Sequence, residues 1–189
     1  SIAREFGKEF FDGDRSHGYG GFSYNPKYWT PVIPDFINHF SLKSGSRILD
    51  VGCAKGFMLL DFLKSNSEFI VKGVDISKYA IENCHDDIKE FVQVENAVSL
   101  PFEDNSFDLV ISINTIHNLD EENCKKALQE IERVSSSGSF ITVDAYNNEE
   151  EKERMFAWNL TAKTIMSVEE WKSFFRKSGY TGDFYWFIP

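Results

Sequence analysis

"ILDVGCAKGF" (residues 48–57) joins a hydrophobic run to a short loop that contains two glycines. The apolar residues predict a buried strand, and "FMLLDFLKS" (57–65) predicts a helix directly after the loop. Gly52 and Gly56 therefore frame a turn from a strand into a helix. The free N–H groups at the start of that helix favour a polar or anionic ligand. An ordinary structural turn is the alternative interpretation.

Strand-like and helix-like stretches alternate from residue 46 onward. The predicted strands are 46–51, 69–76, 91–96, 107–114, 139–146 and 181–189. The predicted helices are 57–65, 77–88, 120–134 and 167–177. This alternation predicts βαβ units in a mainly parallel sheet with helices on both faces. Ligands of such sheets bind at the carboxyl ends of the strands, so we expect the functional site there.

Composition limits the class of protein. A chain of 189 residues with 42 % hydrophobic residues is suited to one globular domain. No apolar run is long enough to span a bilayer and no signal peptide opens the chain, so we expect no membrane partner. Cys53, Cys84 and Cys124 form no CxxC pair, which indicates reduced thiols in a cytoplasmic protein without a metal site. The sequence does not predict the oligomeric state.

Net charge bears on the partner. The chain carries a formal charge of −10, which would repel a nucleic-acid backbone. We therefore expect no nucleic acid as partner, and a small molecule instead.

The glycine loop excludes two common nucleotide sites. A nicotinamide fingerprint needs G-x-G-x-x-G and a Walker loop needs G-K-[ST], whereas this loop reads D-x-G-x-x-x-G. Asp75 ends the second predicted strand, 19 residues after Gly56, where an acid is placed to accept both ribose hydroxyls of a nucleoside. The loop is thus predicted to hold a nucleoside cofactor without a pyrophosphate.

Four segments together resemble a known family. They read "ILDVGCAKG", "VKGVDIS", "ENAVSLPFEDNSFDLVISINTIHNL" and "EIERV…SFITVDAY". In order and spacing they are similar to successive motifs of class I S-adenosylmethionine-dependent methyltransferases of the small-molecule "type 11" kind, over residues 46–146. The resemblance implies a single-domain Rossmann-like α/β sandwich at 46–189. It also implies S-adenosylmethionine as cofactor and S-adenosylhomocysteine as product.

The resemblance assigns cofactor contacts to particular residues. Asp50, Gly52, Cys53 and Gly56 would surround the methionine part, Asp75 would bind the ribose, and Ile76 would flank the adenine. Asn96, Ala97 and Asn114 complete the expected cofactor set. The chain departs from the family at Asn96, where Asp is usual, and at Ala54, where many members have Gly. The side-chain oxygen of Asn96 can still accept a hydrogen bond from the adenine amino group.

Candidate groups for the acceptor side lie at strand ends and in the first 45 residues. His117 follows the fourth predicted strand, and Asp144 and Tyr146 end the fifth. A capping or exposed histidine is the alternative for His117. Residues 1–45 are predicted to form an N-terminal extension that folds over the cofactor as a lid, a role that the resemblance suggests. Its candidate residues are His17, Tyr19 and Tyr24, with flexibility from Gly18, Gly20 and Gly21.

Several alternatives stay open at this point. The aromatic residues of the extension could equally be core, and Trp158, Trp171 and Trp186 are read as core. The family usually has two strands after its last helix, whereas only 181–189 remains here. Residues 159–166 could therefore join the sheet, the C-terminal edge could be reduced, or the native chain could continue beyond Pro189. A helix is expected to begin at Thr30–Pro31, with Thr30 as its cap.

The functional prediction is a methyltransferase that acts on a small, polar metabolite. A cofactor-binding sensor or scaffold without turnover is the alternative, and an RNA or protein methyltransferase is disfavoured by the charge and by the compact chain.

Overall fold

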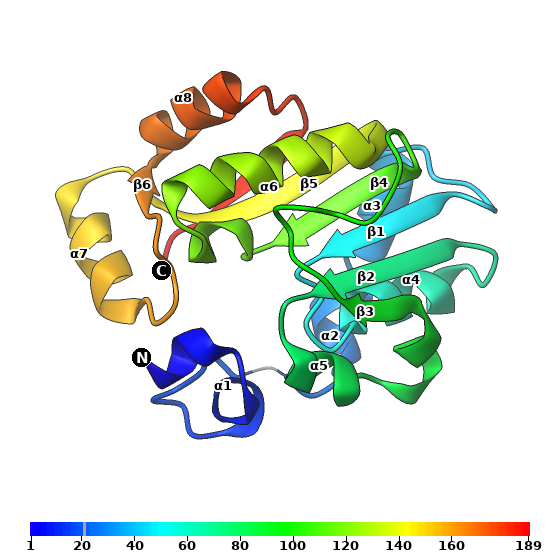
Figure 1. Cartoon of the computed structure of the whole chain (residues 1–189), viewed down its shortest axis with the longest axis horizontal. Helices are drawn as coiled ribbons and strands as arrows, with labels where there is room; N and C mark the ends of the chain where they lie inside the picture. The colour runs from blue at the N-terminus through cyan, green and yellow to red at the C-terminus, as the bar shows by residue number, and fades with distance from the viewer. Residues whose placement is uncertain (21) are drawn as a thin grey trace.

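The computed structural model describes residues 1–20 and 22–189. A seven-stranded sheet has the order β3-β2-β1-β4-β5, and both β6 and β7 pair with β5 (Figure 1). The strands are β1 Arg47–Val51, β2 Ile70–Asp75, β3 Val92–Val94, β4 Phe107–Ile113, β5 Ser135–Tyr146, β6 Met166–Ser167 and β7 Asp183–Phe187. Their pairings are parallel, which confirms the expected α/β fold with a mainly parallel sheet.

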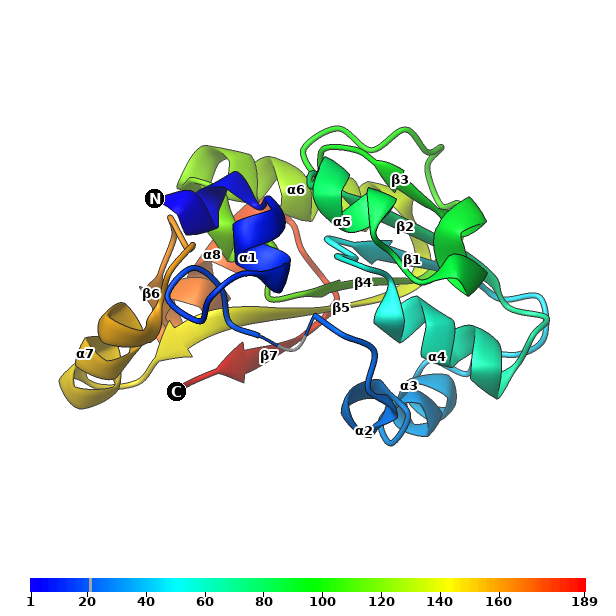
Figure 2. The same cartoon turned by 90° about the horizontal axis from the view of Figure 1, so that it is seen from below.

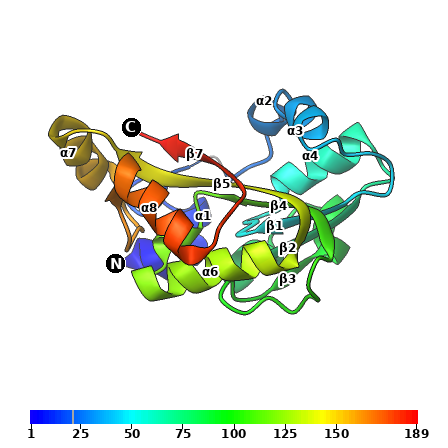
Figure 3. The same cartoon turned by 90° about the horizontal axis from the view of Figure 1, so that it is seen from above.

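Helices cover both faces of this sheet (Figure 3). Helices α2 Pro26–Trp29, α3 Ile33–His39 and α4 Phe57–Ser65 lie on one face, and α6 Glu121–Val134 and α8 Val168–Ser178 lie on the other. Each face has its own apolar core. The sheet is therefore buried between two layers, so its central strands read as continuous hydrophobic runs.

The helices of the second face begin and end as the sequence predicts. Asp120 caps α6 by accepting a hydrogen bond from the Asn123 N–H. A capping box between Ser167 and Glu170 opens α8, and Gly179 ends it in the left-handed conformation. These capping signals act within one turn of the helix, so the sequence alone predicts them.

Two predicted helices differ from the structure. The helix expected at 77–88 ends early, because α5 spans only Lys78–Glu82 and a 3₁₀ helix, η2 Asp86–Phe91, follows. His85 separates the two, since its backbone is extended and its Nδ1 accepts from the Asp87 N–H. The expected cap at Thr30 is wrong. Thr30 closes α2, and its hydroxyl donates to Asp61 Oδ2 (2.8 Å) from across the helix layer.

At the C-terminal edge of the sheet, where the sequence left three alternatives open, the structure has the strands β6 and β7. Met166 and Ser167 pair with the last two residues of β5. The final strand, β7, lies beside residues 140–144 of β5 in parallel. Within residues 1–20 and 22–189 the sheet contains no antiparallel pair. Because β7 pairs with β5 alone, it forms an open edge of the sheet, and Tyr185 on it is exposed.

The first 45 residues divide between two places in the fold. η1 Ile2–Glu5 and α1 Lys8–Asp12 lie beyond the carboxyl ends of the strands, on the same side as α7 Glu149–Trp158 (Figures 1 and 2). Helices α2 and α3 pack against α4 instead. We call residues 1–20 the N-terminal segment. Among the described residues, no helix is both long and apolar enough to cross a membrane.

Candidate active site

A cavity of about 910 Å³ opens at the carboxyl ends of β1, β2, β4 and β5. The N-terminal segment and the end of α7 form its opposite wall. Six of the nine predicted cofactor residues line this cavity: Gly52, Asp75, Ile76, Asn96, Ala97 and Asn114. The predicted acceptor-side residues that line it are Tyr19, His117 and Asp144. The topology therefore gathers the main sequence candidates at one site.

The glycine loop lies close against the loop that follows β4. Gly52 has φ +82°, and a Cβ there would stand 2.2 Å from the Thr115 side chain. Gly56 has φ +77°, and between them Ala54 is also left-handed, at φ +49°. The first position thus requires glycine for conformation and for space. Ala54, where many family members have Gly, adopts a left-handed backbone conformation like its two glycine neighbours in the loop, so the alanine does not disrupt the turn.

Asp75 is fixed at the floor of the cavity. Its Oδ2 accepts from the Ala54 N–H and its Oδ1 from the Ser77 N–H, both at 2.8 Å. Burial raises the pKa of this carboxyl, although both hydrogen bonds favour its charged form. Each oxygen keeps a second lone pair, so the carboxylate can accept the two ribose hydroxyls of a nucleoside.

Asp50 lies beneath the glycine loop and does not line the cavity. Its Oδ1 is buried without a hydrogen-bond partner among the described residues. Burial, with the nearby charge of Asp75, raises its pKa to about 8. A buried orphan oxygen at the end of β1 fits a cofactor that brings a donor or a positive charge. Cys53 and Gly56 also lie outside the cavity lining, and the Cys53 thiol is buried in the core.

The three residues predicted to contact the adenine, Ile76, Asn96 and Ala97, all line the cavity. Ile76 is 57 % exposed and lies at the end of β2, next to Asn96 and Ala97 in the lining. Asn96 Oδ1 already accepts from the Val98 N–H (3.1 Å) and keeps one lone pair. These residues suit the ring and the amino group of an adenine, so the residues present fit S-adenosylmethionine.

His117 and Asp144 form a buried pair on the other side of the cavity. The Asp144 N–H donates to His117 Nδ1 (3.1 Å), and His117 Nε2 lies 3.5 Å from Asp144 Oδ2. Burial lowers the pKa of His117 to about 3 and raises the pKa of Asp144 to about 7. The Asn159 amide donates to Asp144 Oδ2. Since Nδ1 already accepts a hydrogen bond, that nitrogen is not free to take a proton from an acceptor.

The raised pKa of Asp144 predicts a pH-dependent stability difference. An unfolded Asp has a pKa of about 4, so the folded protein binds the proton more tightly between about pH 4 and pH 7. The stability from this group is present at low pH and is lost as the pH rises toward 7. Asp144→Asn does not titrate, so we expect the variant to gain stability relative to wild type over this range, by at most about 1.4 kcal/mol per pH unit.

Urea unfolding at pH 5, 6, 7 and 8 measures this difference. Asp35→Asn, at an exposed carboxyl of α3, is the control and should follow wild type at each pH. A difference between Asp144→Asn and wild type that stays constant with pH would contradict the assignment.

Three predicted acceptor-side residues lie elsewhere. Tyr146 lines a separate, shallower depression with Lys177 and Phe174. Tyr24 packs outside α4, where its hydroxyl donates to Asp61 Oδ1 (2.7 Å). His17 is half-buried and outside the cavity lining. The sequence does not specify side-chain directions at strand ends and in loops, so it could not separate these three residues from Tyr19.

The N-terminal segment packs as a small apolar core and also lines the cavity. Phe10 and Phe11 form a small apolar cluster with Phe22 and Ala80, and the same three phenylalanines line the cavity. Gly18 lies against the Phe10 carbonyl, where a Cβ would stand 2.0 Å from that oxygen, and Gly20 is left-handed at φ +79°. Gly21, the third predicted flexible position, lies outside the described residues. The aromatic residues are thus both core and cavity wall, and motion of this segment as a lid stays a prediction.

The sequence interpretation missed part of the cavity wall. Tyr19 stacks on Trp158 with ring centroids 4.5 Å apart, and Trp158 lies 4.7 Å from Phe187. We call Tyr19, Trp158 and Phe187 the aromatic wall. Trp158 was read as core, yet it lines the cavity, and so do two cations, Arg4 and Lys163. The position of Trp158 at the end of a helix that follows β5 was the one available signal.

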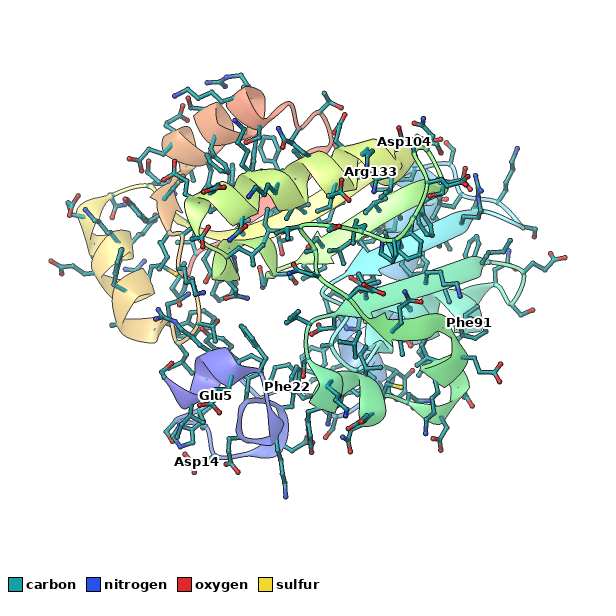
Figure 4. The ribbon with its side chains drawn as sticks, viewed as in Figure 1. Glu5, Asp14, Phe22, Phe91, Asp104 and Arg133 are labelled. Atoms are coloured by element: carbon teal, nitrogen blue, oxygen red, sulfur yellow. The ribbon has the colours of Figure 1, made fainter. Side chains whose placement is uncertain are left out.

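Charges at the far end of the sheet belong to a separate network. Arg133 pairs with Asp104 (2.9 Å) and Glu130 (2.7 Å) near the end of α6. Figure 4 shows Arg133 and Asp104 together, far from Glu5 on the N-terminal segment and from Phe22. This ion-pair network therefore stabilises the fold away from the cavity.

The glycine loop, the acid Asp75 at the end of β2 and the parallel sheet are typical of nucleoside-binding α/β enzymes of the Rossmann-like kind. Residues 49–143 match the family model described as "Methyltransferase domain". The chain belongs to the class I S-adenosylmethionine-dependent methyltransferases, and S-adenosylmethionine is the cofactor of this family. The predicted family, cofactor and enzyme class are confirmed.

Curated relatives narrow the comparison. The chain is 40 % identical over 143 residues to a tRNA (carboxymethyluridine(34)-5-O)-methyltransferase of Arabidopsis thaliana, covering 75 % of this chain and 33 % of that protein. It is 32 % identical over 152 residues to the enzyme of that name in Xenopus tropicalis, covering 80 % of this chain and 22 % of that protein. A 27-O-demethylrifamycin SV methyltransferase of Amycolatopsis mediterranei is 24 % identical, covering 73 % of this chain and 55 % of that protein. The chain thus spans a third or less of the length of the two tRNA enzymes.

Solved structures confirm the fold. The YcgJ protein of Bacillus subtilis superposes with a TM-score of 0.63 at 22 % identity, over 78 % of this chain and 67 % of that one. The [4+2]-cyclase SpnF superposes with a TM-score of 0.64 at 20 % identity, over 90 % of this chain and 61 % of that one. A cyclase on the same fold shows that the architecture by itself does not fix the reaction.

These relatives overturn the expected partner. The sequence interpretation gave a small-molecule acceptor and no nucleic acid, whereas the Arabidopsis and Xenopus relatives are tRNA methyltransferases by name. The physical reason lies in the charge argument. A net charge of −10 sums the whole surface of this chain, while an RNA contacts only part of a protein's surface. Net charge alone therefore does not exclude a nucleic-acid partner.

Proposed function

We propose that this chain methylates an oxygen of a modified uridine in transfer RNA, with a carboxymethyl group on the base as the acceptor. The 40 % identity to the Arabidopsis tRNA (carboxymethyluridine(34)-5-O)-methyltransferase carries this proposal. The cavity supports this proposal, because aromatic side chains line it beside the predicted cofactor residues. An RNA base can enter such a site after it leaves the stack of its neighbours.

The chemistry requires little from the protein. A carboxylate oxygen forms a bond to the methyl carbon as the sulfur–methyl bond breaks. The electron pair of the broken bond stays on the sulfur. The product is a methyl ester, and no proton has to be removed from the acceptor. The chain's own residues then bind and align the two reactants and exclude water. This agrees with His117 Nδ1 being engaged by the Asp144 N–H.

Two matched RNAs test the proposal. One anticodon stem-loop carries 5-carboxymethyluridine at the wobble position, and the other carries uridine there. With methyl-labelled cofactor, we expect label in the first RNA alone, and we expect mild alkali to release it because an ester hydrolyses. Low salt keeps electrostatic binding strong for both RNAs. Equal labelling of the two RNAs, or labelling of neither, would contradict the proposed function.

A further inference from the structure

The predicted cofactor residues line only part of the cavity. Gly52, Asp75 and Ile76 line one side, at the ends of β1 and β2. Asp144 and Trp158 line the other side, at the end of β5 and in the helix that follows it. The acceptor has to approach the methyl group from this second side, which we call the acceptor half.

The aromatic wall bounds the acceptor half with fixed rings. Tyr19 is held by its hydroxyl, which accepts from the Leu160 N–H (2.6 Å) and the Thr161 N–H (3.2 Å). Its ring is nearly parallel to that of Trp158, at an interplanar angle of 21°. Rings held in this way form a stacking surface for another planar ring, and stacking serves any base because every base has a π-face.

Arg4 places a cation beside this wall. Its Nε and Nη2 donate to the carbonyl oxygens of Thr161 (3.3 Å) and Ala162 (3.1 Å). In the part of the chain that the structure describes, no carboxylate lies within ion-pair distance of Arg4, and its Nη1 makes no hydrogen bond. The residues 160–162 thus fix both the Tyr19 hydroxyl and the Arg4 guanidinium. The guanidinium keeps donors available for an anion.

Two carboxyl groups also line this side of the cavity. Asp144 is buried, and its raised pKa of about 7 keeps a large share of it neutral near neutral pH. Glu5 is exposed and adjoins Arg4 along the chain. Lys163 adds a second cation to the lining. A bound anion would therefore meet two cations, one exposed carboxylate, and one buried acid whose charged form is disfavoured by burial.

We propose that the acceptor half binds a planar ring against the aromatic wall and pairs a carboxylate on that ring with Arg4. Arg4, Trp158 and Phe187 are then the specificity-determining residues of the acceptor half. This inference rests on the proposed function for the identity of the ring, a pyrimidine nucleoside. The recognition chemistry itself is that of a planar carboxylate.

Nucleoside binding tests the inference apart from methyl transfer. 5-Carboxymethyluridine and the neutral 5-methyluridine are titrated into the protein saturated with S-adenosylhomocysteine. We expect wild type to prefer the carboxylate, and Arg4→Gln to lose that preference by roughly tenfold or more, the loss of a charged hydrogen bond. Trp158→Leu and Phe187→Leu should weaken both nucleosides alike, by about tenfold each.

Two control variants make the same kinds of substitution at residues outside the cavity. Arg47→Gln removes an exposed arginine at the opposite end of the sheet, and Phe156→Leu removes an exposed ring of the same helix α7. Both should bind like wild type. Affinity for S-adenosylhomocysteine should be unchanged in Arg4→Gln. A fall there would assign Arg4 to the cofactor carboxylate and overturn the inference.

The outcomes separate this inference from the proposed function. If wild type labels the carboxymethyl RNA but Arg4→Gln keeps the full preference for the carboxylate, the inference is wrong and the function stands. If wild type labels no RNA while the Arg4-dependent preference is present, the subsite is supported and the proposed RNA substrate is wrong. A wild type that does not distinguish the two nucleosides overturns the subsite directly.

Discussion

Gly52→Ala should destabilise the protein by about 2–5 kcal/mol and abolish measurable cofactor binding. Two effects act together at this position. The residue has φ +82°, where an L side chain is strained, and its new Cβ would stand 2.2 Å from the Thr115 side chain. Thr115 must then shift, and it lies in the loop that lines the cavity beside Asn114. Urea unfolding and calorimetry with S-adenosylhomocysteine measure the two losses.

Gly45 supplies a matched control for the strain alone. It has φ +84°, and a Cβ there would meet nothing within 4 Å. Gly45→Ala should therefore lose only about 1–2 kcal/mol of stability, the cost of the left-handed backbone, and should bind the cofactor normally. Equal effects of the two substitutions would show that the contact with Thr115 has no consequence.

Asp75→Ala should weaken S-adenosylhomocysteine by roughly 1–3 kcal/mol, or about 5- to 150-fold. The carboxylate accepts from two backbone N–H groups, which holds it at the cavity floor with lone pairs left for the ribose. Asp75→Asn keeps one acceptor oxygen, so we expect it to lose less. Calorimetry gives the affinities, and Asp35→Ala on the exposed side of α3 serves as the control.

Asp75→Ala also removes the hydrogen bonds from the Ala54 and Ser77 N–H groups, and a destabilised loop would lower the affinity for S-adenosylhomocysteine indirectly. Thermal unfolding without ligand separates the two effects, because a ribose contact changes the shift caused by ligand and not the melting temperature of the free protein. If Asp75→Ala binds the product nucleoside as tightly as wild type does, the ribose assignment is wrong.

Short-range signals in the sequence predicted the cofactor side of the site. The D-x-G-x-x-x-G loop, the acid at Asp75 and the alternation of strands and helices each act over a few residues or one βαβ unit. Parallel strands then carry their carboxyl ends to a common edge, which brings Gly52, Asp75 and Asn96 together. The helix limits followed in the same way where caps were present, as in α6 and α8. They failed at Thr30, whose hydroxyl bonds to the distant Asp61, and at His85, whose extended backbone interrupts the predicted helix.

The sequence did not predict the direction of side chains at the strand ends. His117, Asp144 and Tyr146 all follow or end predicted strands, yet Tyr146 lines the other depression. Asp144 and Tyr146 lie two positions apart in β5, so regular alternation would point both side chains to the same face. The course of the chain at the strand end, which no pattern in the sequence specifies, decides which of them lines the cavity. The positions of Tyr24 and His17 depended in the same way on packing of the N-terminal part of the chain.

By itself, the sequence determined the family and the cofactor through its resemblance to successive motifs of known enzymes. It also predicted the edge of the sheet where the cofactor binds, because that prediction depends on short-range signals and strand order. Only the tertiary structure decided the acceptor half. Arg4 meets the carbonyls of Thr161 and Ala162 across more than 150 positions of the chain, and Tyr19 meets Trp158 across a similar separation. Such contacts form when distant segments pack together, and no periodicity or motif within either segment specifies its partner.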